Sequence, residues 1–167
     1  FDDIGHAMKE RLKHLGLFKD FTENEMKSLD GCFALKEYEN GAIIAGTEII
    51  VKELFIVVEG KVENMLRIPE NVDRTLLIYL PGDFFGELSL FGNKAYLANC
   101  VAIEKTVIAA LNEESISRLI ETDPRTARKF LSRLLELSIQ KLRNVNRSLS
   151  DLVEWGENAS KIGRAHV

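Results

Sequence analysis

The middle of the chain alternates between short apolar segments and tight turns, and this pattern restricts the fold more than any other feature. Turn sequences such as Glu39-Asn40-Gly41 and Glu59-Gly60 separate the segments. Residues 54–58 are apolar without interruption, which is typical of a strand buried on both faces. The expected strands are residues 32–38, 43–44, 54–58, 62–68, 75–80, 99–103 and 106–111. Short strands joined in this way predict a sandwich or a jelly-roll barrel, which is wide enough for one small ligand.

Two helices are expected before the strands, over residues 2–15 and 22–29. In the first, apolar residues recur at spacings of three and four: Ile4, Met8, Leu12 and Leu15. Gly16 fits a helix end, and Thr22 with Glu25 forms a capping box that starts the second helix.

A long helix is expected after the strands. Asp123 is a capping residue and Pro124 suits the first helical position, and no breaker follows before Gly156. About thirty helical residues would make a rod of about 45 Å, longer than a small barrel can cover. Its apolar positions, with Ser138 filling one gap, follow a heptad spacing of fours and threes: Leu131, Leu135, Leu142, Val145, Leu149 and Leu152. The stripe predicts a homodimer with parallel helices; the alternative is that it packs on its own barrel.

The expected fold class is therefore α+β, mainly β: a cupin-like jelly-roll β-barrel with flanking N-terminal helices and a long C-terminal dimerisation helix. The predicted division is a barrel with N-terminal helices over residues 1–122, the long helix over 123–155, and a polar, frayed tail over 156–167.

Composition excludes several classes of function. The length of 167 residues suits one domain, and the net charge of −4 offers no basic field for nucleic acid. No apolar run reaches the ~18 residues of a membrane span, so we expect a cytoplasmic protein with no membrane partner. Cys32 and Cys100 lack metal-ligand spacing and are expected to be reduced, buried thiols.

The histidines argue against catalysis. His6, His14 and His166 all lie outside the expected strands, whereas a metal-dependent cupin enzyme needs histidine and carboxylate ligands on them. No Ser-His-Asp or Cys-His arrangement can be placed near the barrel. We therefore expect no enzyme activity, no metal and no resident cofactor.

One stretch, residues 81–101 with the sequence PGDFFGELSLFGNKAYLANCV, has the character of a binding site. Pro81-Gly82-Asp83 predicts a turn, because proline presets φ and glycine supplies a positive φ. Gly86 precedes a helical turn whose free N–H groups favour an anion. Glu87 is a carboxylate beside that site, so it is better suited to hold a hydroxyl group than a phosphate.

At these residues the chain resembles the cyclic-nucleotide-binding domain family. GDFFGELSLFG is similar to the family's phosphate-binding cassette, and the segments LFIVVEGKVENML, TLLIYLPGDFFGE and ANCVAIEKTVIAAL are similar to its strands, in the family's order. The resemblance covers roughly residues 17–152. It implies a jelly-roll sensor that dimerises through its long helix and takes cAMP or cGMP. The implied ligand-binding residues are Phe85, Gly86, Glu87, Leu88, Ser89, Tyr96, Leu97 and Ala98, with Asn146 on the helix.

The cassette departs from the family where a cyclic phosphate would be held. The family has an arginine, a serine or threonine, and an alanine, and this chain has Tyr96, Leu97 and Ala98. A buried phosphate without a cation is costly. Lys94 is nearby and carries a charge, but it lacks the bidentate fork of arginine.

Three questions stay open at this point. The chain is either a sensor for a cyclic nucleotide or another small anionic ligand, or a degenerate dimerisation and interaction domain that binds none. Asn146 either bonds a purine edge or is a solvated helix residue. Relatives continue into a winged helix-turn-helix, so the chain is either the sensor half of a transcription regulator or a free-standing sensor, and alone it should not bind DNA specifically.

Overall fold

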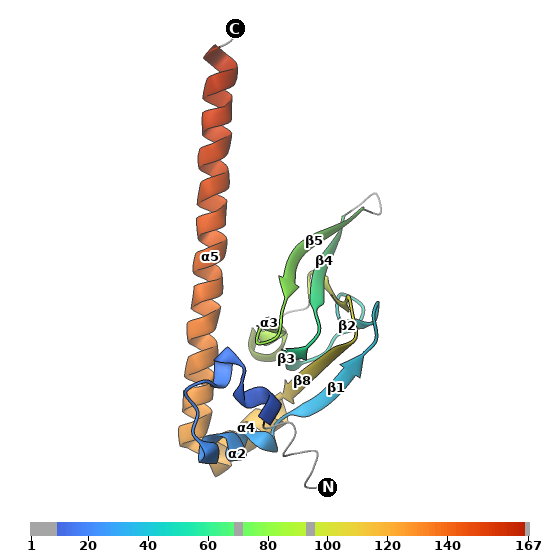
Figure 1. Ribbon diagram of the computed structural model, residues 1–167, viewed down its shortest axis with the longest axis vertical. Coiled ribbons are helices and arrows are strands. Elements are labelled where there is room, and N and C mark those ends of the chain that lie inside the picture. The colour runs from blue at the N-terminus through green and yellow to red at the C-terminus, as the bar shows by residue number, and fades with distance from the viewer. Residues whose placement is uncertain (1–9, 69–71, 93–95, 166–167) are drawn as a thin grey trace. The chain divides into compact units, whose positions relative to one another are not determined.

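The computed structural model describes residues 10–68, 72–92 and 96–165. The chain divides into two compact units, Phe1–Arg128 and Lys129–Val167. The first unit holds the strands and the short helices, and the second consists of most of one long helix (Figure 1).

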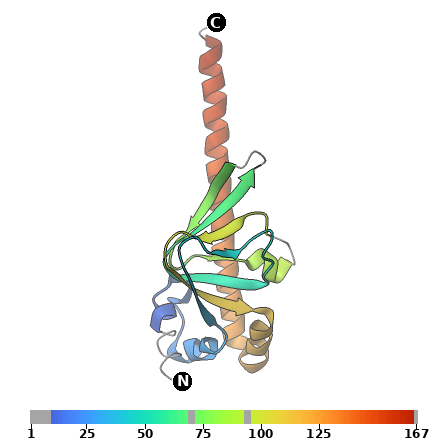
Figure 2. The ribbon, with the colours of Figure 1, turned by 90° about the vertical axis from the view of Figure 1, so that its right-hand side faces the viewer.

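The first unit contains two four-stranded antiparallel sheets (Figures 1 and 2). One has the order β1-β8-β3-β6 and the other the order β2-β7-β4-β5. The strands are β1 (Ala34–Tyr38), β2 (Ile43–Ala45), β3 (Glu53–Glu59), β4 (Val62–Ile68), β5 (Val72–Tyr79), β6 (Phe84–Phe85), β7 (Asn99–Ala102) and β8 (Thr106–Asn112). The prediction of an α+β jelly roll with flanking helices and a long C-terminal helix is confirmed, although the helices contain more residues than the strands. The expected strand over residues 75–80 begins earlier, at Val72, and the two-residue β6 was not expected.

The interior of the barrel is filled from both sheets. Its buried aromatic residues are Phe55 of β3, Tyr79 of β5 and Phe85 of β6. The rings of Phe55 and Phe85 stack with their centroids 5.2 Å apart, and those of Tyr79 and Phe85 stack at 4.9 Å. Residues 54–58 are buried without exception, as their uninterrupted apolar run predicts.

Short helices flank the barrel. The described part of the expected first helix is helical over residues 10–13, while residues 2–9 lie outside the described ranges. A 3-10 turn, η1 (Gly16–Phe18), follows, and then α2 (Glu23–Asp30), whose predicted capping box between Thr22 and Glu25 is present. Beyond the strands lies α4 (Glu113–Thr122). Asn112 is its N-cap residue, and the Asn112 side chain accepts the Ser115 N–H.

The long helix α5 (Pro124–Ala165) has 42 residues. It starts as predicted, because the Asp123 carboxylate accepts the Thr126 N–H at 3.1 Å. The expected frayed tail differs from the structure: residues 156–165 continue the helix. A glycine inside a helix costs only about 1 kcal/mol, and Gly156 meets no proline or second glycine near enough to end it. The division of the chain into a barrel domain and a dimerisation helix at residue 122 stays a prediction.

No helix in the described ranges is long and apolar enough to cross a membrane.

Candidate functional site

The predicted turn before the cassette is present and is tied to β3. Gly82 has φ of +95°, and the Asp83 N–H donates to the Leu80 carbonyl at 2.9 Å. The Val57 N–H donates to the Asp83 carbonyl, and the Gly82 N–H to the Val57 carbonyl, both at 2.9 Å. These bonds fix the point at which the chain enters β6 and Gly86.

Position 86 accommodates only glycine. Its φ is +92°, which other residues rarely adopt. A β-carbon at this position would lie 2.3 Å from the Glu53 carbonyl oxygen, 2.9 Å from the Tyr96 hydroxyl and 3.2 Å from the Phe55 ring. Strand β3 and the Tyr96 side chain therefore close tightly around the Gly86 backbone.

The helix α3 (Glu87–Gly92) follows Gly86 and lies beside β3 (Figure 1). The Ser89 hydroxyl donates to the Val51 carbonyl at 2.7 Å, so it holds the helix to the segment before β3. Leu88 points outward and is 69% exposed, while Phe85 is packed in the core. The half-buried Glu87 carboxylate has neither a hydrogen bond nor an ion pair to any described side chain.

Tyr96 points into the barrel. Its ring packs against the interior cluster, and its buried hydroxyl has no hydrogen-bond partner among the described residues. Burial raises the pKa of this phenol, and the nearby Cys100 and Glu87 raise it further. Of the next two predicted site residues, the Leu97 side chain is 85% exposed to solvent, and Ala98 is buried. Lys94, the proposed source of positive charge, lies outside the described residues.

Two further polar side chains in the same interior were not predicted, Asn64 of β4 and Tyr79 of β5. Cys100 of β7 lies beside them as a buried, free thiol, as predicted. The Asn64 amide nitrogen donates to the Tyr79 hydroxyl at 3.3 Å, and the Asn64 amide oxygen is buried without a partner. Burial raises the pKa of Tyr79 to about 12, and burial likewise raises the pKa of Cys100 to about 12. Both groups therefore stay uncharged at neutral pH.

An ion pair at the rim of this interior was also not predicted. The Lys36 ammonium of β1 lies 2.6 Å from the Glu53 carboxylate of β3 and 5.8 Å from the centre of the Phe55 ring. The alternation of side chains between the two faces of a strand could have predicted this ion pair. Lys36 shares a face with Tyr38, Glu53 shares one with Phe55, and both aromatic residues contact the interior cluster.

The expected helix residues lie in the second unit. Asn146 is exposed on α5, and its role in ligand binding stays a prediction. Most residues of the predicted heptad stripe are exposed, as a dimer interface requires in a single chain: Leu135, Leu142, Val145, Leu149 and Leu152. Leu131 is half-buried. Two exposed apolar residues beside the stripe, Ile139 and Val153, were not predicted.

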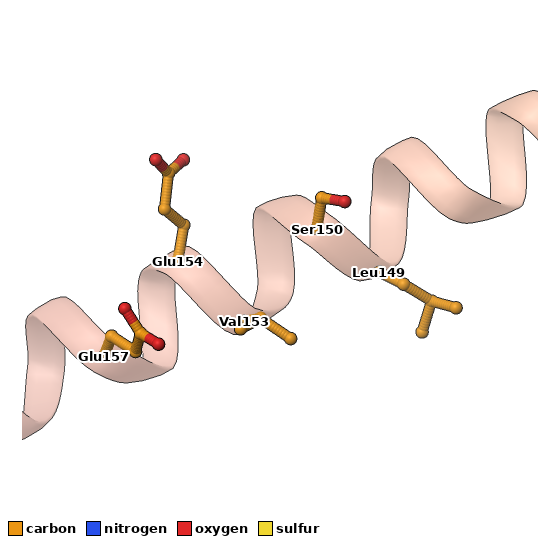
Figure 3. A pocket seen from close by; sticks show the side chains of 5 residues that line it. All are labelled: Leu149, Ser150, Val153, Glu154 and Glu157. Atoms are coloured by element: carbon orange, nitrogen blue, oxygen red, sulfur yellow. The ribbon is translucent and has the colours of Figure 1, made fainter.

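A shallow hollow on α5 is lined by Leu149, Ser150, Val153, Glu154 and Glu157 (Figure 3). Leu149 and Val153 project from one side of the helix, and Ser150 and Glu154 from the other (Figure 3). All its walls come from one helix, so it is part of the exposed helix surface and cannot enclose a ligand.

The described residues contain no group of three or more histidine, cysteine, aspartate or glutamate side chains arranged to hold a metal ion. The interior instead offers hydrogen-bonding groups: two phenols, an amide and a free carboxylate. Such an arrangement can bind and orient a small molecule.

Comparisons with known proteins agree with this geometry. The chain is 24% identical over 146 residues to a CRP-like cAMP-activated global transcriptional regulator of Mycobacterium tuberculosis, covering 87% of this chain and 63% of that protein. It is 29% identical to the cyclic AMP receptor protein of Thermus thermophilus, covering 92% and 69%. The crystal structure of the Thermus thermophilus catabolite activator protein superimposes with a TM-score of 0.68 at 29% identity, covering 81% and 62%.

The chain thus spans 63% of the length of the first of these relatives. A family model described as "Cyclic nucleotide-binding domain" matches residues 35–123, more than half of the chain, and includes both sheets and the cassette. The fold, the turn at Gly82, the constrained Gly86 and this match lead to one conclusion: the chain belongs to the cyclic nucleotide-binding domain family.

Proposed function

We propose that this chain is a ligand-sensing regulatory module, without enzyme activity, that acts in the cytoplasm. Its ligand would bind at the interior face formed by Gly86, Glu87, Tyr96 and Ala98. The buried Phe85 and Ser89 would hold this face in place. The exposed Leu88, Leu97 and Asn146 would reach the ligand only if their segments fold over it.

One observation carries the proposal: the polar groups around Gly86 are incompletely paired. The Tyr96 hydroxyl is buried without a partner, and the Glu87 carboxylate has none among the described side chains. Buried polar groups in folded proteins are almost always bonded, so unpaired ones at a family binding site indicate that a ligand completes them. The names of two relatives include cAMP, so cAMP and cGMP are the first ligands to test.

Signalling is proposed to leave through α5. Exposed leucines at heptad spacing favour a homodimer, and a ligand that binds one helix position better than another would shift the populations of the two. The module would then be the sensing part of a transcription regulator, or a sensor that acts through protein partners, and the barrel and α5 would not bind DNA themselves.

A second candidate function is a degenerate module that serves dimerisation and interaction without a ligand. The observation in its favour is the position of Tyr96, whose hydroxyl occupies the space beside the Gly86 backbone. If this tyrosine never moves away, no ligand can approach the backbone.

Isothermal titration of the purified chain with cAMP and with cGMP tests the proposal, with the mass in solution measured alongside. Saturable binding by a dimer supports the sensor. If neither the two nucleotides nor uncharged adenosine produces heat at millimolar concentration, the degenerate module is correct.

A further inference from the structure

The charges around Gly86 restrict the class of ligand. Among the described charged side chains, the carboxylates of Glu87 and Glu53 raise the pKa of the Tyr96 phenol. The Glu87 carboxylate also raises the pKa of the Cys100 thiol. Asp83 also acts on the phenol of Tyr79. An anion brought to this place would meet negative charges of its own sign.

The described cation at this interior is already neutralised. The Lys36 ammonium is held 2.6 Å from the Glu53 carboxylate, and this carboxylate is mostly buried. The backbone of Glu53 also borders Gly86, since its carbonyl would lie 2.3 Å from a β-carbon there. The pair therefore adds no net positive charge to the site, and an anion could recruit Lys36 only by separating it from Glu53.

The buried polar atoms of this interior that lack a partner among the described residues are uncharged. They are the Tyr96 hydroxyl and one polar atom of the Asn64 amide, and both are buried. Whichever way the amide is turned, one of its two atoms bonds the Tyr79 hydroxyl and the other has no partner. A ligand with hydroxyl or amide groups would satisfy these atoms without moving a charge out of water.

We propose that this site takes an uncharged small molecule that carries hydroxyl or amide groups, in preference to a cyclic phosphate. Such a ligand would bond the Tyr96 hydroxyl and the free atom of Asn64, and Glu87 would accept a ligand hydroxyl. This inference rests on the proposed sensor function and names the ligand class of that same site.

Adenosine and cAMP form a matched pair of probes, because they share the base and the sugar and differ in the cyclic phosphate. Isothermal titration of the whole chain with each is expected to show adenosine binding at least about tenfold more tightly. Equal or tighter binding of cAMP would overturn this inference and leave the sensor function intact. Failure of both probes to bind would overturn both.

Glu53→Gln tests the reason for the preference. The substitution keeps the size of the side chain and releases Lys36 as a free cation, so the affinity for cAMP is expected to rise about fivefold or more while that for adenosine changes less than twofold. Glu63→Gln is the control, since Glu63 precedes Asn64 on β4 and faces the opposite side of the sheet. An unchanged ratio of the two affinities in Glu53→Gln would refute the charge argument.

Discussion

The Tyr96 hydroxyl stands over the backbone of Gly86, 2.9 Å from the place a β-carbon would occupy. The two residues depend on each other, because Gly86 has no side chain and therefore leaves room for the hydroxyl oxygen of Tyr96. The same oxygen lacks a hydrogen-bond partner among the described residues. Tyr96 is thus both the residue that fills the site and the group that a ligand would engage.

Removing the Tyr96 hydroxyl should stabilise the ligand-free domain. Tyr96→Phe deletes a buried oxygen without a partner, and we expect the free energy of unfolding to rise by about 1 kcal/mol. Urea denaturation measures the change. Tyr79→Phe is the matched control: it removes a hydroxyl that bonds Asn64, so it should lower the free energy by a similar amount. A loss of stability in Tyr96→Phe would show that this hydroxyl is bonded in solution.

Gly86→Ala should be more damaging than an equivalent change at Gly41. The two glycines have φ of +92° and +90°, but a β-carbon at Gly41 would meet open space. Gly41→Ala should cost about 1–2 kcal/mol from backbone strain alone. Gly86→Ala adds the collision with the Glu53 carbonyl, and we expect at least about 1 kcal/mol more. Equal losses in urea denaturation would mean that the backbone around Gly86 yields easily.

Restoring the family's phosphate ligands should create affinity for cyclic nucleotides. In Tyr96→Arg with Leu97→Ser, the guanidinium starts from a position that already reaches the Gly86 backbone, and we expect the affinity for cAMP to rise at least about tenfold. Isothermal titration measures it. Leu97→Ser alone is the control and should give no gain, because the exposed Leu97 side chain points to solvent. No gain in the double variant would mean that the pocket is remodelled beyond these residues.

The apolar stripe of α5 should hold two copies together. Leu149→Asp puts a charge on the stripe, and we expect it to shift the chain from dimer to monomer in sedimentation at micromolar concentration. Ser150→Asp adds the same charge one residue away, on the other side of the helix, and should leave the dimer intact (Figure 3). A dimer that stays intact in Leu149→Asp would place the interface away from this stripe.

Stability should fall at alkaline pH because of Cys100. Burial raises its pKa from 9.0 to about 12, so the folded state keeps a proton that the unfolded state loses. The stabilising effect is complete below about pH 9 and is lost as the pH rises toward 12, with a slope of at most about 1.4 kcal/mol per pH unit.

Urea midpoints between pH 8 and pH 10.5 test this expectation. Cys100→Ser should flatten the decline, since serine does not ionise in this range, whereas Cys32→Ser should have a smaller effect because Cys32 is only half-buried. Equal slopes in all three proteins would show that Cys100 does not titrate differently in the two states.

Features set by neighbouring residues were predictable from the sequence. The capping box at Thr22, the cap at Asp123 and the turn at Gly82 each depend on three or four consecutive residues, and all are present. Hydrophobic periodicity likewise located every strand except the two-residue β6 to within a few residues, because each strand's pattern is local.

Features set by contacts between distant strands were not predictable. Asn64 meets Tyr79 because β4 pairs with β5 in a register that places Val62 opposite Tyr79, so Tyr79 is the diagonal neighbour of Asn64 on the same face. The pairing of Lys36 with Glu53 similarly crosses β8, which separates β1 from β3 in the sheet. A single sequence does not contain these registers, so the polar interior became visible only in the folded chain.

The hydrogen bond from Ser89 to the Val51 carbonyl has a mechanical consequence. It joins α3 to the start of β3, and β3 is also bonded to the turn that precedes Gly86. These bonds join the two walls of the proposed site, and we expect a ligand that shifts one wall to shift both. The side chains of Leu88 and Phe91 are exposed on α3, so a displacement of α3 would move this apolar surface.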